Sequence, residues 1–223
     1  MTAIDWSYDG KFIATGDRNG TCRILDASSL EPLGFCNGKT HGKKRGGAWI
    51  EDIKFSPDSS MVAWGTHYGS SFVEFAKINS QGKPTLVCSH TSGISSALMH
   101  LDWSLDGYAM VINSQAYELY FLSVNRSANG VKVSNMDASS AKNIEWKSWT
   151  STLGFGVQGI WPGVDFTDVN SVCRSQDGNL LATGDDFGKV KLFKWPCIEE
   201  KADFNESIGH SSHVTEVRFS YKD

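Results

Sequence analysis

Three short stretches of this 223-residue chain hold side chains that could do chemistry. NGKTHGKKRGGAW (residues 37–49) places four cations among glycines and contains no Asp or Glu. GFGVQG (residues 154–159) has the G-x-G-x-x-G spacing of dinucleotide-binding loops. His210 and His213, with Cys197 upstream, are residue types that bind zinc. The three stretches point to an acidic partner, a nucleotide and a metal, respectively.

The nucleotide and zinc interpretations lack the sequence context that each requires. A dinucleotide loop leads into a helix whose N-terminus faces the pyrophosphate, but IWPG follows GFGVQG, and no strand–helix alternation surrounds it. We expect a glycine-rich loop or extra strand that packs Phe155, Ile160 and Trp161. The insertion should be ordered and packed on the blade, with Trp161 largely buried. The five cysteines form no C-x-x-C pair, and no G-x-S-x-G elbow occurs. The sequence therefore predicts no cofactor, no metal and no enzyme activity.

The basic run has two interpretations. Lys39, His41, Lys43, Lys44 and Arg45 could form a solvated loop, as exposed connections commonly do. They could instead form a cationic patch for an acidic partner. Because the net charge of the chain is −4, any such attraction has to be local, and nucleic acid is not expected as a partner.

Composition predicts a folded cytoplasmic protein. A hydrophobic fraction of 40% and eight tryptophans exclude a disordered chain. No apolar run reaches the roughly 18 residues of a membrane span, and MTAIDWSYDG lacks the features of a signal peptide. Five scattered cysteines, an odd number, favour a reducing compartment over a disulfide framework.

The elements that position these stretches are repeats. DGKFIATGDRNG (residues 9–20) and DGNLLATGDDFG (residues 177–188) are nearly identical segments. The serine before the turn marks five copies: Ser7, Ser56, Ser104, Ser175 and Ser220. Successive gaps of 49, 48, 71 and 45 residues indicate a period in the forties, with an insertion in the third repeat.

Each copy has the pattern of short antiparallel strands. An alternating segment leads into a turn such as SYDG or SQDG, and an apolar strand, a glycine turn, a third strand and a weaker fourth follow. Such units are typical of β-propeller blades. We therefore predict an all-β propeller fragment of about four four-stranded blades and one orphan strand, HVTEVRFS. The expected units are about 1–38, 39–90, 91–168 with the insertion, and 169–208, and the first strand of a further blade lies in 209–223.

The units resemble WD40 repeats, although the Trp-Asp pair is degenerate: LD, EF, YF and LF stand in its place. Residues 143–193 are similar to a segment of the echinoderm microtubule-associated protein-like (EMAP) family, with the landmarks LGFGV, GIWP, CRS and ATGDDFGKV. The repeated segments, including Asp17 and Asp185, are then expected to have a structural role. At about 45 residues a blade, a seven-bladed ring needs roughly 315. The resemblance therefore implies the C-terminal part of a second propeller.

The resemblance also implies a function. It predicts a non-catalytic scaffold that binds tubulin or microtubules and lies in the cytoplasm on the cytoskeleton, with no membrane or nucleic-acid partner. Tubulin, whose exposed tails are acidic, becomes the partner expected for Lys39, His41, Lys43, Lys44 and Arg45. Two alternatives remain: a WD40 platform for another cytoplasmic complex, and, on GFGVQG alone, a nucleotide-binding enzyme.

Overall fold

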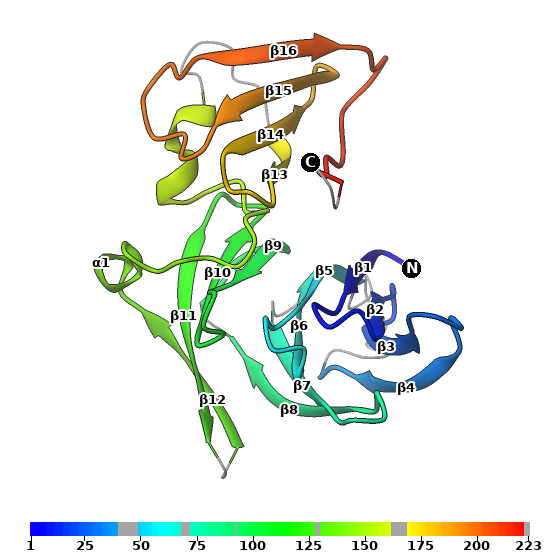
Figure 1. Ribbon diagram of the computed structural model, residues 1–223. Coiled ribbons are helices and arrows are strands. Elements are labelled where there is room, and N and C mark those ends of the chain that lie inside the picture. The colour runs from blue at the N-terminus through cyan, green and yellow to red at the C-terminus, as the bar shows by residue number, and fades with distance from the viewer. Residues whose placement is uncertain (40–48, 68–71, 92, 128–129, 162–168, 221–223) are drawn as a thin grey trace. The chain divides into compact units, whose positions relative to one another are not determined.

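In the computed structural model, the regular secondary structure of the described residues is almost wholly antiparallel β-sheet (Figure 1). The structure describes residues 1–39, 49–67, 72–91, 93–127, 130–161 and 169–220. Four sheets each contain four strands that pair in chain order. Helix among the described residues is limited to α1 (Ala138–Ala141) and the 3-10 segment η1 (Phe155–Ile160). The prediction of four four-stranded units with almost no helix is confirmed.

The strands of the first two sheets are β1 (Ala3–Trp6), β2 (Phe12–Gly16), β3 (Thr21–Asp26), β4 (Pro32–Asn37), β5 (Trp49–Phe55), β6 (Met61–His67), β7 (Val73–Ile78) and β8 (Pro84–His90). Those of the third and fourth sheets are β9 (Leu98–Trp103), β10 (Ala109–Ser114), β11 (Leu119–Ser127), β12 (Gly130–Met136), β13 (Val169–Arg174), β14 (Leu180–Asp185), β15 (Lys189–Lys194) and β16 (Phe204–Ile208). Among the described residues, neither helical segment has the length and apolar character of a membrane span.

The serine that marks each repeat closes the turn between the first and second strands. Ser7 Oγ donates to Asp9 (2.7 Å) and accepts from the backbone N–H of Phe12 (2.9 Å). The same two bonds recur at Ser56, Ser104 and Ser175. The turn needs a left-handed residue, which is Gly10 (φ 74°) in the first sheet and Ser59 (φ 59°) in the second. The serine spacing therefore records a repeated turn.

The two nearly identical phrases form the same strand–turn–strand unit. Asp17 Oδ1 accepts from the backbone N–H groups two and four residues later, at 2.9 and 3.0 Å. Asp185 Oδ1 does the same at 3.0 and 2.9 Å. A cation six residues after each aspartate pairs with its other oxygen, Arg23 at 2.7 Å and Lys191 at 3.6 Å. These aspartates are structural, as the repeat predicts.

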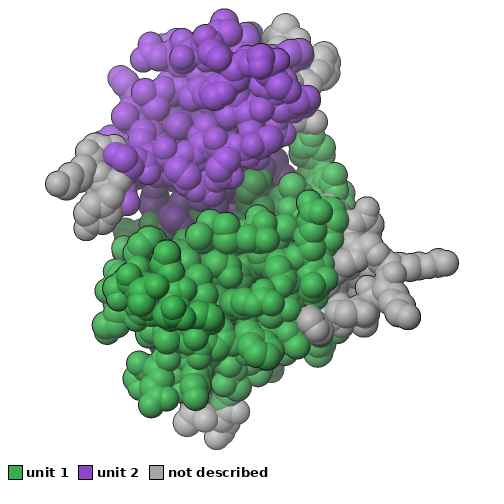
Figure 2. All heavy atoms as spheres, turned by 90° about the vertical axis from the view of Figure 1, so that its right-hand side faces the viewer, with its two compact units in different colours: residues 1–147 green, residues 148–223 purple. Residues whose placement is uncertain are grey.

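The chain divides into two compact units, residues 1–147 and 148–223 (Figure 2). In the first unit the first three sheets stack on one another. The first strand of each following sheet lies against a glycine of the preceding one: a Cβ added at Gly16 would lie 2.4 Å from Ile50 Cγ2, and one at Gly65 would lie 2.7 Å from Leu98 Cβ. Side chains from neighbouring sheets, such as Ile24 and Trp64, share one fully buried core. Glycine at these positions is what allows the sheets to approach closely.

The innermost strands of neighbouring sheets are joined through side chains. Asp5 Oδ2 on β1 accepts from the backbone N–H of Phe55 on β5 at 2.6 Å. Asp52 Oδ2 on β5 accepts from Leu101 N on β9 at 3.0 Å. These bonds satisfy backbone donors that no strand partner reaches, which a buried N–H requires. Burial raises the pKa of Asp5 to about 6, although Lys54 and the Phe55 N–H oppose the rise.

The second unit contains the fourth sheet and an ordered insertion that packs on it. Trp149 is 2% exposed, and its ring centroid lies 5.5 Å from that of Trp195. Gly159 N donates to Cys197 O at 2.8 Å, and Cys197 N donates to Gly156 O at 2.9 Å. The expectation of an ordered, packed insertion is confirmed for its described residues.

Trp161 departs from the sequence expectation. We expected a largely buried side chain, but Trp161 is only partly buried. Its indole N–H donates to the carbonyl of Thr152 at 3.0 Å. A tryptophan that satisfies its polar edge on a neighbouring backbone can leave part of its ring in solvent. Among the described residues of the insertion, the buried aromatic is therefore Trp149.

The segment expected to be an orphan strand, residues 213–220, forms no ladder with any of the four sheets in the described part of the chain. It nevertheless repeats the contacts of a following inner strand. Val214 N donates to Asp185 O at 2.9 Å, as Ile50 N does to Asp17 O at 3.1 Å. Val217 N donates to Ser171 Oγ at 3.1 Å. We propose that 209–223 begins a further repeat: the segment is docked like a first strand, but a ladder requires a neighbouring strand.

Candidate partner-binding surface

The basic run connects β4 to β5 at one edge of the first two sheets. Within it, the structure describes Lys39 and leaves His41, Lys43, Lys44 and Arg45 outside the described residues. Lys39 N donates to Glu74 Oε1 at 2.8 Å, and Lys39 Nζ lies 5.9 Å from the centre of the Phe72 ring. The start of the run is therefore fixed to the second sheet.

The buried carboxylate that holds Lys39 is Glu74. Burial raises its pKa, while hydrogen bonds from the Ser89 hydroxyl and the Lys39 N–H partly oppose the rise. A Cβ at Gly38 would lie 3.2 Å from Glu74 Oε1, so the chain passes close over this group. Glu74 is thus occupied by internal donors.

Sequence analysis did not identify Arg18 as part of this surface. Arg18 is exposed in the β2–β3 turn, and its guanidinium carbon lies 4.7 Å from the centre of the Trp49 ring at the other end of the run. The register Thr21↔Asn37 places that turn at the edge from which the run leaves. A cation above an indole face is held in a defined position. In such repeats, the glycine turns and the sheet-to-sheet connections lie at the same edge. That rule could have placed Arg18 near the basic run from the sequence alone.

The glycines of GFGVQG are explained by packing. A Cβ at Gly154 would lie 2.3 Å from Trp149, and one at Gly156 would lie 2.3 Å from Trp195. A Cβ at Gly159 would lie 2.3 Å from the carbonyl oxygen of Glu199. The segment forms short 3-10 turns, where an extra strand was one alternative. Because the glycines admit neighbouring aromatic rings and backbone, the motif needs no nucleotide to account for it.

The residues considered as zinc ligands have other surroundings. His213 Nδ1 lies 2.6 Å from Asp186 Oδ1, and Cys197 is 2% exposed beside Gly159. His210 is exposed. Within the described ranges, no group of three or more His, Cys, Asp or Glu side chains is arranged to hold a metal ion.

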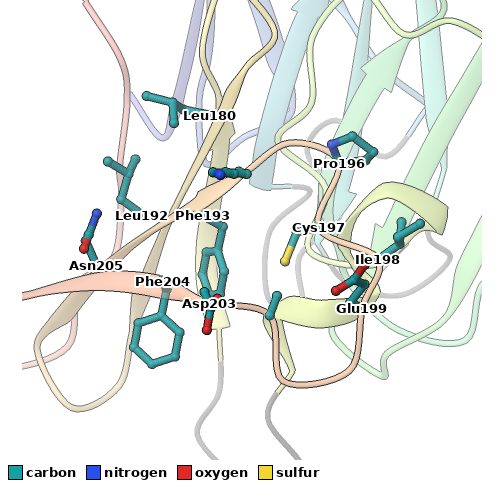
Figure 3. A pocket seen from close by; sticks show the side chains of 12 residues that line it. Leu180, Leu192, Phe193, Pro196, Cys197, Ile198, Glu199, Asp203, Phe204 and Asn205 are labelled. Carbon is teal, nitrogen blue, oxygen red and sulfur yellow. The ribbon is translucent and has the colours of Figure 1, made fainter.

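A pocket of about 540 Å³ opens on the fourth sheet (Figure 3). Its lining includes Leu180 and Leu192 on the sheet and Phe204 on β16. The positions of Leu180 and Leu192 correspond to Phe12 and Ile24 in the first sheet, which the second sheet covers. The apolar part of the lining therefore corresponds to the face on which a following sheet packs, and Lys194, Glu199, Asp203 and Asn205 form the polar part of the lining.

The meander sheets, the recurring turn and the stacking of sheets on glycine define a WD-repeat β-propeller architecture. The family model for the "Echinoderm microtubule-associated protein second beta-propeller" matches residues 1–223, the entire chain. The chain belongs to this family.

Among similar proteins, echinoderm microtubule-associated protein-like 2 of Rattus norvegicus is 37% identical over 215 residues, which is 96% of this chain and 31% of that protein. The 77 kDa echinoderm microtubule-associated protein of Strongylocentrotus purpuratus is 36% identical over 212 residues, 95% of this chain and 29% of that protein. The chain thus spans less than a third of the length of either relative. Among solved structures, the β-propeller domain of Cps50 (Swd1) from Myceliophteria thermophila matches with a TM-score of 0.50 and 10% identity, covering 98% of this chain and 76% of that one. That likeness concerns the fold.

Proposed function

We propose that this chain is part of a non-catalytic scaffold that binds tubulin or microtubules through a propeller surface. The observation that carries the proposal is membership in the family, because the names of its relatives describe microtubule-associated proteins. In this proposal the protein acts in the cytoplasm, on the microtubule cytoskeleton, and its partners are proteins rather than nucleic acid or membrane.

We assign the contact to the edge that carries Lys39, His41, Lys43, Lys44 and Arg45. Two described cations support this assignment: Lys39 stands at the start of the run, and Arg18 lies over Trp49 at its end. The assignment extends the positive charge of the run to a residue from a separate turn.

The nearby carboxylates do not cancel this charge at the surface. Asp17 accepts two backbone N–H groups and pairs with Arg23, and Glu74 is buried under Lys39 and Ser89. A cationic edge of this kind attracts an acidic partner at long range and tolerates variation in its geometry. The acidic tails of tubulin fit that chemistry.

The test is co-sedimentation of the 223-residue chain with polymerised tubulin across a salt series. We expect binding at low salt that weakens as the salt concentration rises, because the Debye length falls from about 10 Å at 0.1 M to about 3 Å at 1 M. Microtubules whose tails have been removed with subtilisin should bind less. If the chain does not pellet with microtubules even at low salt, the proposal is wrong, and a platform for another complex takes its place.

A further inference from the structure

Two cysteines of the first sheet lie directly opposite each other on neighbouring strands. Cys22 on β3 and Cys36 on β4 are Cα partners in the antiparallel register. Both belong to the same buried side of the sheet: Cys22 is 0% exposed, and Cys36 packs against the same core from its partly buried position. The remaining cysteines are Cys88, Cys173 and Cys197, and none of them pairs with a cysteine in a described strand register.

The backbone geometry permits a covalent bond between this pair. Gly38 N donates to Gly20 O at 3.1 Å, so the pair two residues further along, Cys22 and Cys36, also occupies a hydrogen-bonded position of the ladder. Such positions have Cα atoms about 5.5 Å apart. Disulfides usually span about 4.4–6.8 Å between Cα atoms. The thiols already interact: a hydrogen bond with Cys36, together with burial, raises the pKa of Cys22 well above its ordinary value.

We propose that Cys22 and Cys36 form a reversible redox site, at which a peroxide oxidises the two thiols to an intramolecular disulfide. The partly buried Cys36 reacts first: its thiolate attacks one peroxide oxygen, giving a sulfenic acid and releasing hydroxide. Cys22 then attacks the Cys36 sulfur and displaces the hydroxyl group, which leaves as water. The net reaction converts two thiols and one hydrogen peroxide into one disulfide and two waters.

The two positions account for both the order of the reaction and its reversibility. Cys22 is buried and poorly ionised, so it is a weak nucleophile toward an oxidant in solution. Once Cys36 is oxidised, its adjacency to Cys22 replaces a bimolecular encounter with an intramolecular one. Hydrogen-bonded strand pairs hold their Cβ atoms farther apart than a relaxed disulfide requires, and a strained disulfide is readily reduced.

The bond would tie β4 to β3 next to the start of the basic run. β4 ends at Asn37, and the Gly38 and Lys39 contacts follow immediately. Oxidation therefore fastens the strand that leads into residues 39–45. The redox site does not depend on which partner the chain binds. It can therefore be tested independently of tubulin binding.

The experiment treats the folded chain with hydrogen peroxide, blocks remaining thiols with N-ethylmaleimide under denaturing conditions, and maps the tryptic peptides by mass spectrometry. Cleavage after Arg18, Arg23 and Lys39 separates Cys22 (residues 19–23) from Cys36 (residues 24–39). We expect a disulfide-linked pair of these peptides and a drop from five free thiols to three. Dithiothreitol should restore all five.

Two variants complete the design. Cys36→Ala should abolish the linked peptide and leave Cys22 as an alkylated thiol after peroxide treatment. Cys88→Ala, a matched change of another partly buried strand cysteine, should leave the linked peptide unchanged. The proposal is overturned if the folded parent yields sulfinic or sulfonic acid at Cys36 while Cys22 remains a free thiol, or if the linked peptides join two different chains.

Discussion

The joint between the first and second sheets and the joint between the fourth sheet and residues 213–220 use the same contacts with different results. Both have a backbone bond from the incoming strand and a glycine beneath it, Gly16 under Ile50 and Gly184 under Val214. In the first joint Phe12 is 8% exposed, whereas the corresponding Leu180 is only partly buried and lines a pocket. The difference teaches that docking of the inner strand is local, while burial of the core needs the outer strands that follow.

The largest expected effect on the free energy of unfolding concerns the insertion, whose aromatic residues pack on the fourth sheet of the second unit. Trp149→Ala should lower the free energy of unfolding by about 3–5 kcal/mol, because it empties a buried aromatic site against Trp195. Trp161→Ala should cost clearly less, since Trp161 is only partly buried. Urea unfolding followed by far-ultraviolet circular dichroism would measure both. Equal losses would show that the insertion is held by the Trp161 contact as much as by Trp149.

The second prediction compares the two joints directly. Gly16→Val should destabilise the first unit by about 3 kcal/mol, because a branched side chain cannot fit against Ile50 when the sheets above and below are fixed. Gly184→Val meets Val214 in a segment without a ladder, which can shift, so about 1 kcal/mol is expected. Thermal unfolding of both variants is the measurement. Gly209→Val, at an exposed glycine with nothing within 4 Å, is the control.

A smaller effect should appear in the pH dependence of the first joint. The folded pKa of Asp5 is about 6, above its ordinary value of 3.8, so the folded state binds its proton more tightly than the unfolded state does. The unfolding free energy of the parent should therefore fall, through this group, as pH rises from about 4 to about 6. Asp5→Asn keeps an oxygen for the Phe55 N–H and should remove this fall.

The measurement is the difference in unfolding free energy between Asp5→Asn and the parent at a series of pH values. It should increase in favour of the variant through that window and level off above about pH 7. Ser171→Ala, which removes a side-chain acceptor for an inner-strand N–H at the other joint, introduces no titrating group and should give a pH-independent difference. A flat difference for Asp5→Asn would mean that Lys54 fully compensates the burial of Asp5.

The repeated pattern of strands and turns made most of the fold predictable from the sequence. The serine positions and the paired aspartates Asp17 and Asp185 are local signals, because each side chain bonds to backbone within six residues. The contacts between sheets were not predictable in this way. Asp5 meets Phe55 and Gly16 meets Ile50 only after the sheets stack, and nothing in the spacing identifies those partners.

The candidate surface was predicted less completely. A run of cations is visible in the sequence, but the arrangement of Arg18 over Trp49 depends on which turns share an edge. For Trp161 the sequence prediction was wrong. A tryptophan in a segment rich in aromatic residues was expected to be buried, but its hydrogen bond to Thr152 lets it remain partly exposed. Composition predicts that a segment is packed, whereas which ring faces inward depends on neighbours distant in the chain.

The smallest expected change in stability accompanies the most direct test of the functional account. Reversing Lys43, Lys44 and Arg45 to Glu should alter the unfolding free energy by under about 0.5 kcal/mol, because the sequence predicts a solvated loop there and substitutions in such loops usually have small effects. A matched control reverses Lys77, Lys83 and Lys132, which are exposed at the opposite edge of their own sheets and give the same change in net charge.

The deciding measurement is the affinity of the parent and both triple variants for microtubules across a salt titration. The account predicts that the Lys43–Arg45 reversal weakens binding markedly at low salt, that the control binds much as the parent does, and that the difference shrinks as salt rises. Equal affinity of the Lys43–Arg45 variant and the parent at every salt concentration would contradict the assignment of the contact to this edge.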